Sequence, residues 1–229
     1  MFTSAVNCIL FDLDGTLIDG VDDLVAAINV VLRDSGLTPV DRALLEPMLG
    51  DGMRALAQRV FAAHGVTAEG EALDQLARAY LAAYKATRYH HTRLFNGVAD
   101  TLRALHAQGW RIGLASNKLT EPCEQILRRL GVYDFFTVIV GSDAAGVRKP
   151  DPGHLRHALA GLGFDAARGD RAVMVGDHAN DIRAARGCGI VAIAVAFATD
   201  PARARGLGAD ALLTDFRDLP AALAQLLAV

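Results

Sequence analysis

The sequence lacks several features that would direct it to a particular environment. It has only three cysteines, widely spaced and without a CxxC pair, so we expect a reduced compartment rather than a disulfide framework. Its 23 basic and 26 acidic residues leave no positive excess to attract nucleic acid or an acidic membrane surface. The longest apolar run, residues 190–198, is far shorter than the ~20 residues of a membrane-spanning helix.

The first residues also lack a secretory signal, in which a basic segment precedes an apolar core and a small-residue cleavage site. The nucleotide-binding pattern GxxxxGK[ST] is absent, as is GxGxxG after a strand. Together these absences predict a cytoplasmic protein with no nucleic-acid partner and no membrane partner. The sequence leaves open whether the chain works as a monomer or as a homodimer.

The composition is that of a globular protein. The chain has 229 residues, of which 52% are apolar and 21% charged. This length falls between one and two domains and is ample for a hydrophobic core. The balance of apolar and charged residues is unlike that of a disordered chain.

Apolar periodicity divides the chain into two parts. Residues 18–90 contain only helical patterns, with apolar side chains three and four positions apart. From Val98 onward, short apolar strands alternate with helices, which predicts a parallel sheet covered on both faces. The expected fold class is therefore α/β, with a Rossmann-like parallel-sheet core formed by residues 1–17 and 91–229. A helical cap domain, residues 18–90, is inserted after the first strand.

The individual elements follow from the same patterns. The helices expected in the cap are Val21–Leu32, Met53–Ala63 and Leu73–Tyr84. The later strands are expected at 110–115, 137–140, 172–175, 190–194 and 211–213, and helices at 98–108, 121–130 and 152–162, with further helices after 175 and 213. Asp151 stands before Pro152 and is the expected N-cap of its helix.

The first strand ends in an unusual stretch. The apolar run that starts at Cys8 is followed by two carboxylates one residue apart, Asp12 and Asp14, and then by Gly15. Two acids at the end of a buried strand repel each other and lose hydration unless a cation or ligand compensates them. Such a conflict between local preference and burial is typical of a functional site.

Polar groups also follow the other strands of the predicted sheet. Ser116-Asn117-Lys118 follows the second strand, Lys149 follows the third, and Asp177 and Asp181 follow the fourth. Ligands of parallel sheets bind beyond the carboxyl ends of the strands, so we expect one shared crevice. Carboxylates suit Mg²⁺, and a hydroxyl, an amide and a lysine can hold phosphoryl oxygens. An aspartate can attack phosphorus while a second carboxylate moves protons.

Four of these segments resemble, in order, the four motifs of the haloacid dehalogenase superfamily. They are Asp12-Leu13-Asp14-Gly15-Thr16, Ser116, Lys149 before Pro150, and Gly176-Asp177 with Asp181. The helical insertion and the runs Ser116–Lys118 and Gly176–Ile182 are similar to those of phosphoglycolate phosphatases. The resemblance covers nearly the whole chain and implies a hydrolase of phosphoric monoesters. The acid at position 14 argues against dehalogenation, because a halide leaving group needs no proton.

The resemblance implies a role for each matching residue. Asp12 would be the nucleophile, forming an aspartyl-phosphate, and Asp14 the general acid and base. Lys149 would be catalytic and would bind the phosphoryl group together with Ser116. The Mg²⁺ cofactor would be held by Asp12, the main-chain carbonyl of Asp14, and Asp177, with Asp181 in support. The other substrate-binding candidates are Thr16, Gly50, Arg54, Asn117 and Lys118.

Several of these residues also have a simpler structural interpretation. Ser116 could cap a helix near Lys118, and Asp181 could be a first-turn acid that favours the helix dipole. Arg54 could pair with a substrate carboxylate or be an exposed helix arginine. His178 lies in the site by sequence but has no assigned role.

The expected substrate is a small phosphorylated metabolite, with 2-phosphoglycolate foremost and sugar phosphates as alternatives. Two other functions stay open at this point. A phosphomutase resembling β-phosphoglucomutase would use the same nucleophile and acid/base, and a bisphosphate requirement would identify it. A non-catalytic metabolite-binding protein on the same scaffold would fail to hydrolyse an aryl phosphate.

Overall fold

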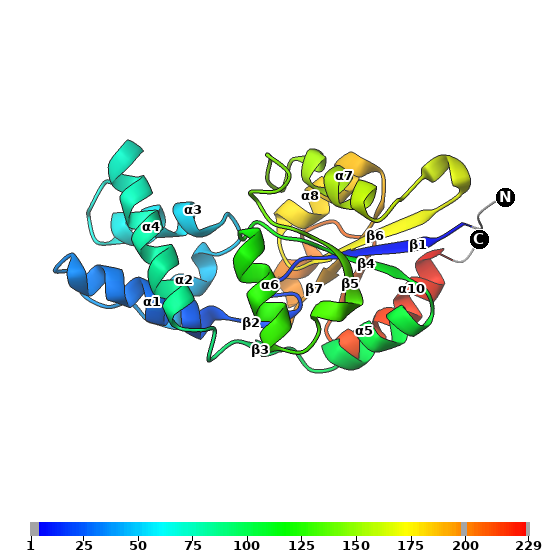
Figure 1. Ribbon diagram of the computed structural model, residues 1–229, viewed down its shortest axis with the longest axis horizontal. Coiled ribbons are helices and arrows are strands. Elements are labelled where there is room, and N and C mark those ends of the chain that lie inside the picture. Colours follow the sequence, from blue (N-terminus) through cyan, green and yellow to red (C-terminus); the bar gives the residue numbers. More distant parts are fainter. Residues whose placement is uncertain (1–4, 198–200, 228–229) are drawn as a thin grey trace. The chain divides into compact units, whose positions relative to one another are not determined.

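The computed structural model describes residues 5–197 and 201–227 and forms two compact units (Figure 1). One unit contains the chain up to Asp19 and from Leu94 onward, and the other contains Gly20–Arg93. The chain passes between the units twice, at strands β2 (Ile18–Asp19) and β3 (Arg93–Leu94), which pair as a two-stranded sheet.

The first unit is built on a six-stranded sheet in the order β5-β4-β1-β6-β7-β8. Each neighbouring pair of strands in this sheet is parallel. This finding confirms the predicted α/β class. The strands are β1 Asn7–Phe11, β4 Arg111–Ala115, β5 Phe136–Val140, β6 Arg171–Gly176, β7 Val191–Val195 and β8 Ala211–Leu213.

Helices cover both faces of this sheet. Figure 1 shows α7 and α8 on one face and α5 and α10 on the other. The helices are α5 Val98–Ala107, α6 Thr120–Arg129, α7 Pro152–Gly161, α8 Ala179–Cys188, α9 Pro201–Arg205 and α10 Leu219–Leu227, with single 3₁₀ turns η2 Tyr133–Phe135, η3 Ala166–Arg168 and η4 Phe216–Asp218.

The central strand shows why the sequence forms this sheet. Cys8 and Leu10 of β1 belong to the core beneath α7 and α8, whereas Ile9 and Phe11 point to the opposite face and are also fully buried. Phe11 stacks on Phe216 of η4, with ring centroids 5.8 Å apart. A strand buried on both faces reads as a continuous apolar run, and β1 does.

The second unit is helical. Its elements are α1 Val21–Asp34, α2 Arg42–Leu45, η1 Glu46–Met48, α3 Met53–Ala63 and α4 Gly70–Ala86. Both α1 and α3 pack against α4. Tyr80 and Tyr84 of α4 are fully buried, and the Tyr80 hydroxyl donates a hydrogen bond to the carbonyl of Leu24 over 3.2 Å. The long helices match the predicted periodicity, since their apolar faces supply this core.

A buried carboxylate ties the two chain ends of the helical unit together. Oδ2 of Asp23, in the first turn of α1, accepts hydrogen bonds from the His91 N–H (2.9 Å), the Thr92 N–H (2.7 Å) and the Thr92 hydroxyl (2.7 Å). Just before this clamp, Arg88 and Tyr89 have left-handed backbones, with φ of 51° and 54°. Tyr89 packs edge-on against Tyr84, with ring centroids 5.0 Å apart.

Some short elements were not expected from the sequence. The two-residue strands β2 and β3 and the four-residue helix α2 are too short to produce a readable period. The predicted N-cap of α7 is confirmed, since Oδ1 of Asp151 accepts the Gly153 N–H over 2.7 Å. No helix within the described residues is long and apolar enough to cross a membrane.

Candidate active site

The site forms where β1 lies between β4 and β6. From β1 the chain builds β4 and β5 on one side and β6 to β8 on the other, which makes the carboxyl end of β1 the switch point of the sheet. The Asp12 N–H continues the ladder by donating to the Val175 carbonyl over 2.9 Å. Asp12 and Asp177 therefore lie side by side, each just beyond the carboxyl end of one of two neighbouring strands.

Two glycines make room for these carboxylates. Gly15 has φ +80°, and a Cβ there would lie 2.3 Å from Oδ2 of Asp177. A Cβ on Gly176 would lie 2.3 Å from Oδ2 of Asp181. Neither position can carry a side chain without displacing an acid of the site.

Lys149 is the central cation of the site. Its Nζ lies 2.7 Å from Oδ1 of Asp12 and 2.5 Å from Oδ1 of Asp181, and only 3% of the residue is exposed. Burial alone would lower the pKa of this ammonium, but the two carboxylates outweigh burial and raise the pKa above its usual value. Lys149 is therefore charged and binds two carboxylates at once.

Asn117 holds the main chain of Lys149 in place. Its Oδ1 accepts the Lys149 N–H and its Nδ2 donates to the Lys149 carbonyl, each over 3.0 Å. The amide thus brackets one residue from both sides and fixes where the lysine side chain begins. A role for Asn117 in substrate binding stays a prediction.

Asp177 and Asp181 complete a carboxylate cluster with Asp12. One oxygen of each lies within 4.8 Å of the others. Burial first, and then the neighbouring carboxylates, raise the pKa of Asp177 well above its usual value. Burial also raises the pKa of Asp181, against the opposing effect of Lys149. Burial is the largest cause of both shifts, and repulsion between the like charges adds to it.

Asp177 and Asp181 also accept hydrogen bonds from neighbouring residues of the chain. The Thr16 hydroxyl donates to Oδ1 of Asp177 over 3.1 Å. Oδ2 of Asp181 accepts the His178 N–H over 3.0 Å, while Nδ1 of His178 accepts the Asn180 N–H over 3.2 Å. His178 and Asp181 thus form a capping box at the start of α8. The first-turn interpretation of Asp181 is confirmed, and the same carboxylate also forms an ion pair with Lys149.

Asp14 has a separate partner. Its Oδ2 lies 3.1 Å from Nζ of Lys118, whereas its buried Oδ1 has no hydrogen-bond partner among the described residues. Burial and the charge of Asp12 raise the pKa of Asp14 despite the attraction of Lys118. A carboxyl with a raised pKa and an unpartnered oxygen is suited to carry a proton.

Ser116 does not cap the helix that follows it. The N-cap position of α6 is Leu119, so the capping interpretation is wrong. The Ser116 N–H donates to the Val140 carbonyl over 2.9 Å, and its Oγ accepts the Lys118 N–H over 3.3 Å. Ser116 is buried at the carboxyl end of β4, at the edge of the sheet where Asp12 ends β1.

The donor set fits a divalent cation. Four carboxylates (Asp12, Asp14, Asp177 and Asp181) stand against two ammonium groups (Lys118 and Lys149), a formal charge of −4 + 2 = −2. Carboxylate oxygens are the ligands that Mg²⁺ prefers. A bound divalent cation would cancel this excess charge and lower the raised carboxyl pKa values.

The two candidates outside the core, Gly50 and Arg54, lie in the helical unit. Gly50 has φ +111°. Nε of Arg54 donates to Oδ1 of Asp74 over 2.7 Å, and about half of its side chain (48%) is exposed. The guanidinium already has one partner, and its binding to a substrate stays a prediction.

Sequence reasoning missed two side chains that position others in the site, and it missed one signal in the composition. The clamp by Asn117 and the cap by His178 depend on contacts that spacing alone does not show. The lysine count was a usable signal: the chain has only three lysines, Lys85, Lys118 and Lys149, and two of them lie in this site. A scarce residue type concentrated at strand ends favours a functional role over a solvated surface.

The fold and the site together define an α/β enzyme of phosphoryl chemistry, with carboxylates gathered around a buried lysine at the sheet's switch point. A family profile described as haloacid dehalogenase-like hydrolase matches residues 9–195. The chain belongs to this family.

Similar proteins narrow the activity. The chain is 36% identical to a phosphoglycolate phosphatase of Caulobacter vibrioides over 96% of this chain and 91% of that protein. A crystal structure of a predicted phosphoglycolate phosphatase from Haemophilus somnus has a TM-score of 0.85 at 26% identity, covering 95% and 97% of the two chains. CbbY from Rhodobacter sphaeroides, in complex with xylulose-(1,5)bisphosphate, has a TM-score of 0.75 at 26% identity, covering 93% and 96%. The protein is a phosphoric monoester hydrolase.

Proposed function

We propose that the protein hydrolyses a small phosphoric monoester, foremost 2-phosphoglycolate, through an aspartyl-phosphate on Asp12 and with Mg²⁺ as cofactor. The observation that carries the mechanism is the double ion pair of Lys149 with Asp12 and Asp181. This contact orients Asp12 at the strand end, two residues before Asp14, whose Oδ1 has no hydrogen-bond partner among the described residues. The names of the similar phosphatases support the substrate.

In the first half-reaction, a carboxylate oxygen of Asp12 attacks phosphorus. Lys149 holds Oδ1 of Asp12, which leaves Oδ2 for the attack. The bond from phosphorus to the ester oxygen breaks as the new bond to Asp12 forms, and Asp14 donates its proton to the departing oxygen. The raised pKa of Asp14 keeps that proton available closer to neutral pH.

In the second half-reaction, Asp14 accepts a proton from a water molecule that attacks the aspartyl-phosphate. The bond between phosphorus and Asp12 breaks, inorganic phosphate leaves and both carboxyl groups return to their starting states. Ser116 and Lys149 hold the non-bridging oxygens through both steps, since a hydroxyl and an ammonium are suitable donors to them.

The residues that would hold Mg²⁺ are Asp12, Asp177 and the main-chain carbonyl of Asp14. Asp181 would support these ligands indirectly, because both of its oxygens already have partners in Lys149 and His178. The cation would supply charge compensation between the phosphoryl oxygens and the carboxylates.

A second candidate is the hydrolysis of a sugar phosphate. The complex of the Rhodobacter sphaeroides protein with a sugar bisphosphate favours it. Both candidates share the same core chemistry and differ in the leaving group. The carboxylate of 2-phosphoglycolate is the feature that Arg54 would recognise through its fork of donors.

A substrate panel tests the proposal. We would measure kcat/KM for 2-phosphoglycolate, several sugar phosphates and an aryl phosphate, each with Mg²⁺ and with a chelator. We expect 2-phosphoglycolate to rank first and activity to require the metal. Acid quenching with ³²P-labelled substrate should trap label on the protein. If no label is trapped and Asp12→Asn stays active, the reaction does not pass through an aspartyl-phosphate.

A further inference from the structure

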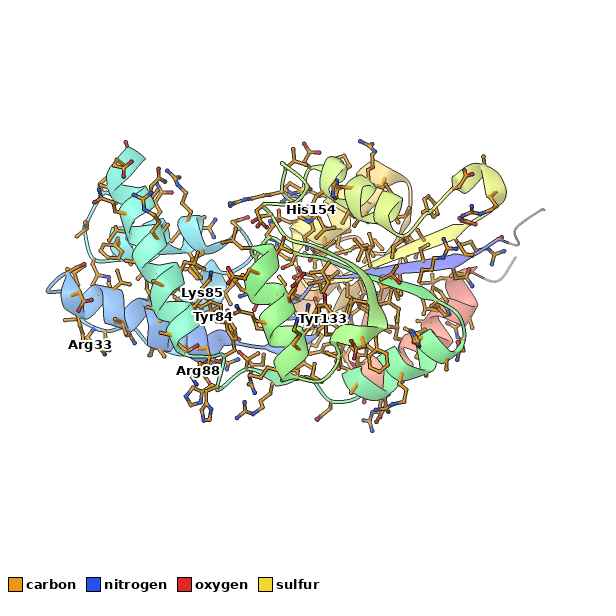
Figure 2. The ribbon with its side chains drawn as sticks, in the orientation of Figure 1. Arg33, Tyr84, Lys85, Arg88, Tyr133 and His154 are labelled. Carbon is orange, nitrogen blue, oxygen red and sulfur yellow. The ribbon has the colours of Figure 1, made fainter. Side chains whose placement is uncertain are left out.

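A buried histidine lies beside the site without a role in the chemistry above. His154 is the third residue of α7 and is 0% exposed. Figure 2 shows it next to the loop that connects β5 to α7, the loop that carries Lys149. A fully buried imidazole needs partners for its polar atoms, and its partners here are both main-chain carbonyls.

One of the two carbonyls belongs to the loop of Lys149, and the other, on β5, accepts the Ser116 N–H. Nδ1 of His154 lies 3.0 Å from the carbonyl oxygen of Val147, two residues before Lys149. Nε2 lies 3.3 Å from the carbonyl oxygen of Val140, the last residue of β5. That Val140 carbonyl also accepts the Ser116 N–H over 2.9 Å. The ring therefore lies between the loop of Lys149 and the carbonyl that aligns Ser116.

The ring has one proton for these two carbonyls. Burial first, and then the nearby charge of Lys149, lower the pKa of His154, so the ring is neutral and carries a single N–H. The shorter contact assigns that proton to Nδ1, which donates to the Val147 carbonyl. In this tautomer Nε2 carries a lone pair and makes no hydrogen bond to the Val140 carbonyl, whose donor is the Ser116 N–H; the ring only packs against the end of β5.

The hydrogen bond to Val147 restrains the middle of the loop between β5 and α7, which the contacts at the two ends of that loop do not reach. At the start of the loop, the Ser142 N–H donates to the Lys118 carbonyl over 2.9 Å and Oδ1 of Asp143 accepts the Thr120 N–H over 2.9 Å. At its end, Asn117 brackets Lys149. Val147 lies between these points, and its side chain is exposed.

We propose that His154 is a positioning residue for the reaction, holding Lys149 and Ser116 at the spacing that a phosphoryl group requires. It does so by donating a hydrogen bond from α7 to the Val147 carbonyl of the Lys149 loop, while the ring packs beside the Val140 carbonyl at the end of β5. The inference rests on the proposed function, in which these two residues bind the phosphoryl oxygens. It concerns neither proton transfer nor metal binding.

Three variants test the proposal. His154→Leu removes the N–H, and His154→Asn keeps an N–H two bonds from Cβ, where Nδ1 stands. His157→Leu changes an exposed histidine of the same helix and is the matched control. We would measure kcat and KM for an aryl phosphate, inhibition by inorganic phosphate, and the pH–rate profile, at a temperature where thermal unfolding shows every variant to be folded.

His154→Leu should lower kcat/KM by roughly ten- to a hundredfold, the scale of loss for a misplaced catalytic group. It should weaken inhibition by inorganic phosphate and leave the shape of the pH–rate profile unchanged. His154→Asn should recover activity to within a few fold of wild type, and His157→Leu should match wild type. If the leucine variant does not fold, His154→Gln, whose amide reaches the level of Nε2 instead, must be slower than His154→Asn.

The inference is wrong if His154→Leu keeps wild-type kcat/KM, or if the asparagine variant loses as much as the variants without the N–H at Nδ1. Lys149→Met and Ser116→Ala, assayed alongside, separate this failure from failure of the proposed function. If both remain active, the proposed phosphoryl site is wrong. If both are inactive while His154→Leu is normal, only the positioning role is wrong.

Discussion

The helical unit and the α/β core both bury carboxylates, but they compensate them differently. Asp23 of the helical unit directs three neutral donors, all from residues 91 and 92, to a single oxygen. In the core, Asp12, Asp177 and Asp181 crowd together, and burial with mutual repulsion raises the pKa of Asp177. The first arrangement satisfies Oδ2 of Asp23 with donors of the chain alone and leaves its buried Oδ1 without a hydrogen-bond partner among the described residues. In the proposed function, the second receives its compensation from a cation or a substrate.

This difference separates a structural acid from a functional one. Removing a carboxylate that satisfies main-chain donors leaves those donors buried and unpaired, which lowers stability. Removing a carboxylate from a crowded cluster relieves repulsion and costs function instead. The two regions should therefore respond to the same kind of substitution in opposite ways.

The largest expected effect is on activity. Asp12→Asn removes the nucleophile and should reduce kcat by at least about 10⁴-fold, as for other residues that act directly on the substrate. The free energy of unfolding should change little, because relieved repulsion in the cluster offsets the lost ion pair with Lys149, which keeps Asp181 as a partner. Kinetics with an aryl phosphate and urea unfolding measure the two effects, with the exposed Asp100→Asn as control. An Asp12→Asn protein that is both active and unstable would contradict the comparison.

The opposite result is expected for Asp23. Asp23→Ala leaves the buried donors of His91 and Thr92 without partners and should lower the free energy of unfolding by about 3 kcal/mol. The activity of the folded protein toward an aryl phosphate should change by no more than a few fold. Asp22→Ala, the exposed neighbour in the same turn, is the control for urea unfolding. Equal stability of the two variants would show that the clamp does not hold the helical unit together.

Adding metal tests the incomplete compensation of the core directly. A cation that binds only the folded protein should stabilise it by about 2.7 kcal/mol at a hundred times its dissociation constant. Mg²⁺ should therefore raise the melting temperature of the wild type, and a chelator should reverse the gain. In Asp177→Asn the same addition should give little shift. A gain that survives in this variant would place the metal elsewhere.

The sequence predicted the core site better than the contacts that support it. The acids, the serine and the lysine follow apolar strands directly, and parallel strands bring their carboxyl ends to one edge. The clamp of Asn117 on Lys149 joins residues 32 positions apart, and that of Asp23 on Thr92 joins residues 69 apart. Neither bond leaves a periodic or local pattern, because each depends on where the folded chain returns.

The same reason explains the elements that were missed. Strands of two residues, such as β2 and β3, have no alternation to read, and they form only because the two chain crossings meet. His154 shows that even a correctly predicted helix does not reveal the contacts of each residue on it. A single histidine on the apolar side of a helix reads as a core residue, and only the folded loop reveals its two carbonyl partners.

The smallest expected effect concerns backbone strain beside the clamp. Arg88, just beyond the end of α4 in Figure 2, is exposed and has φ +51°, a conformation that costs an L-residue about 1–2 kcal/mol. Glycine adopts it freely but loses more entropy on folding, so Arg88→Gly should raise the free energy of unfolding by about 1 kcal/mol or less. Arg78→Gly, at an exposed position inside α4, should lower it by about 1 kcal/mol.

Tyr89→Gly separates strain from packing at the neighbouring position. Tyr89 has the same left-handed backbone, but its buried ring packs on Tyr84, so the lost contact should outweigh the relieved strain by about 2 kcal/mol or more. Urea unfolding of these glycine variants gives the sign for each position. If Arg88→Gly is destabilising, residues 88 and 89 are not strained in the folded protein. A stabilising Arg88→Gly would show that the helical unit holds a strained connection next to the Asp23 clamp, at the point where the chain returns to the core.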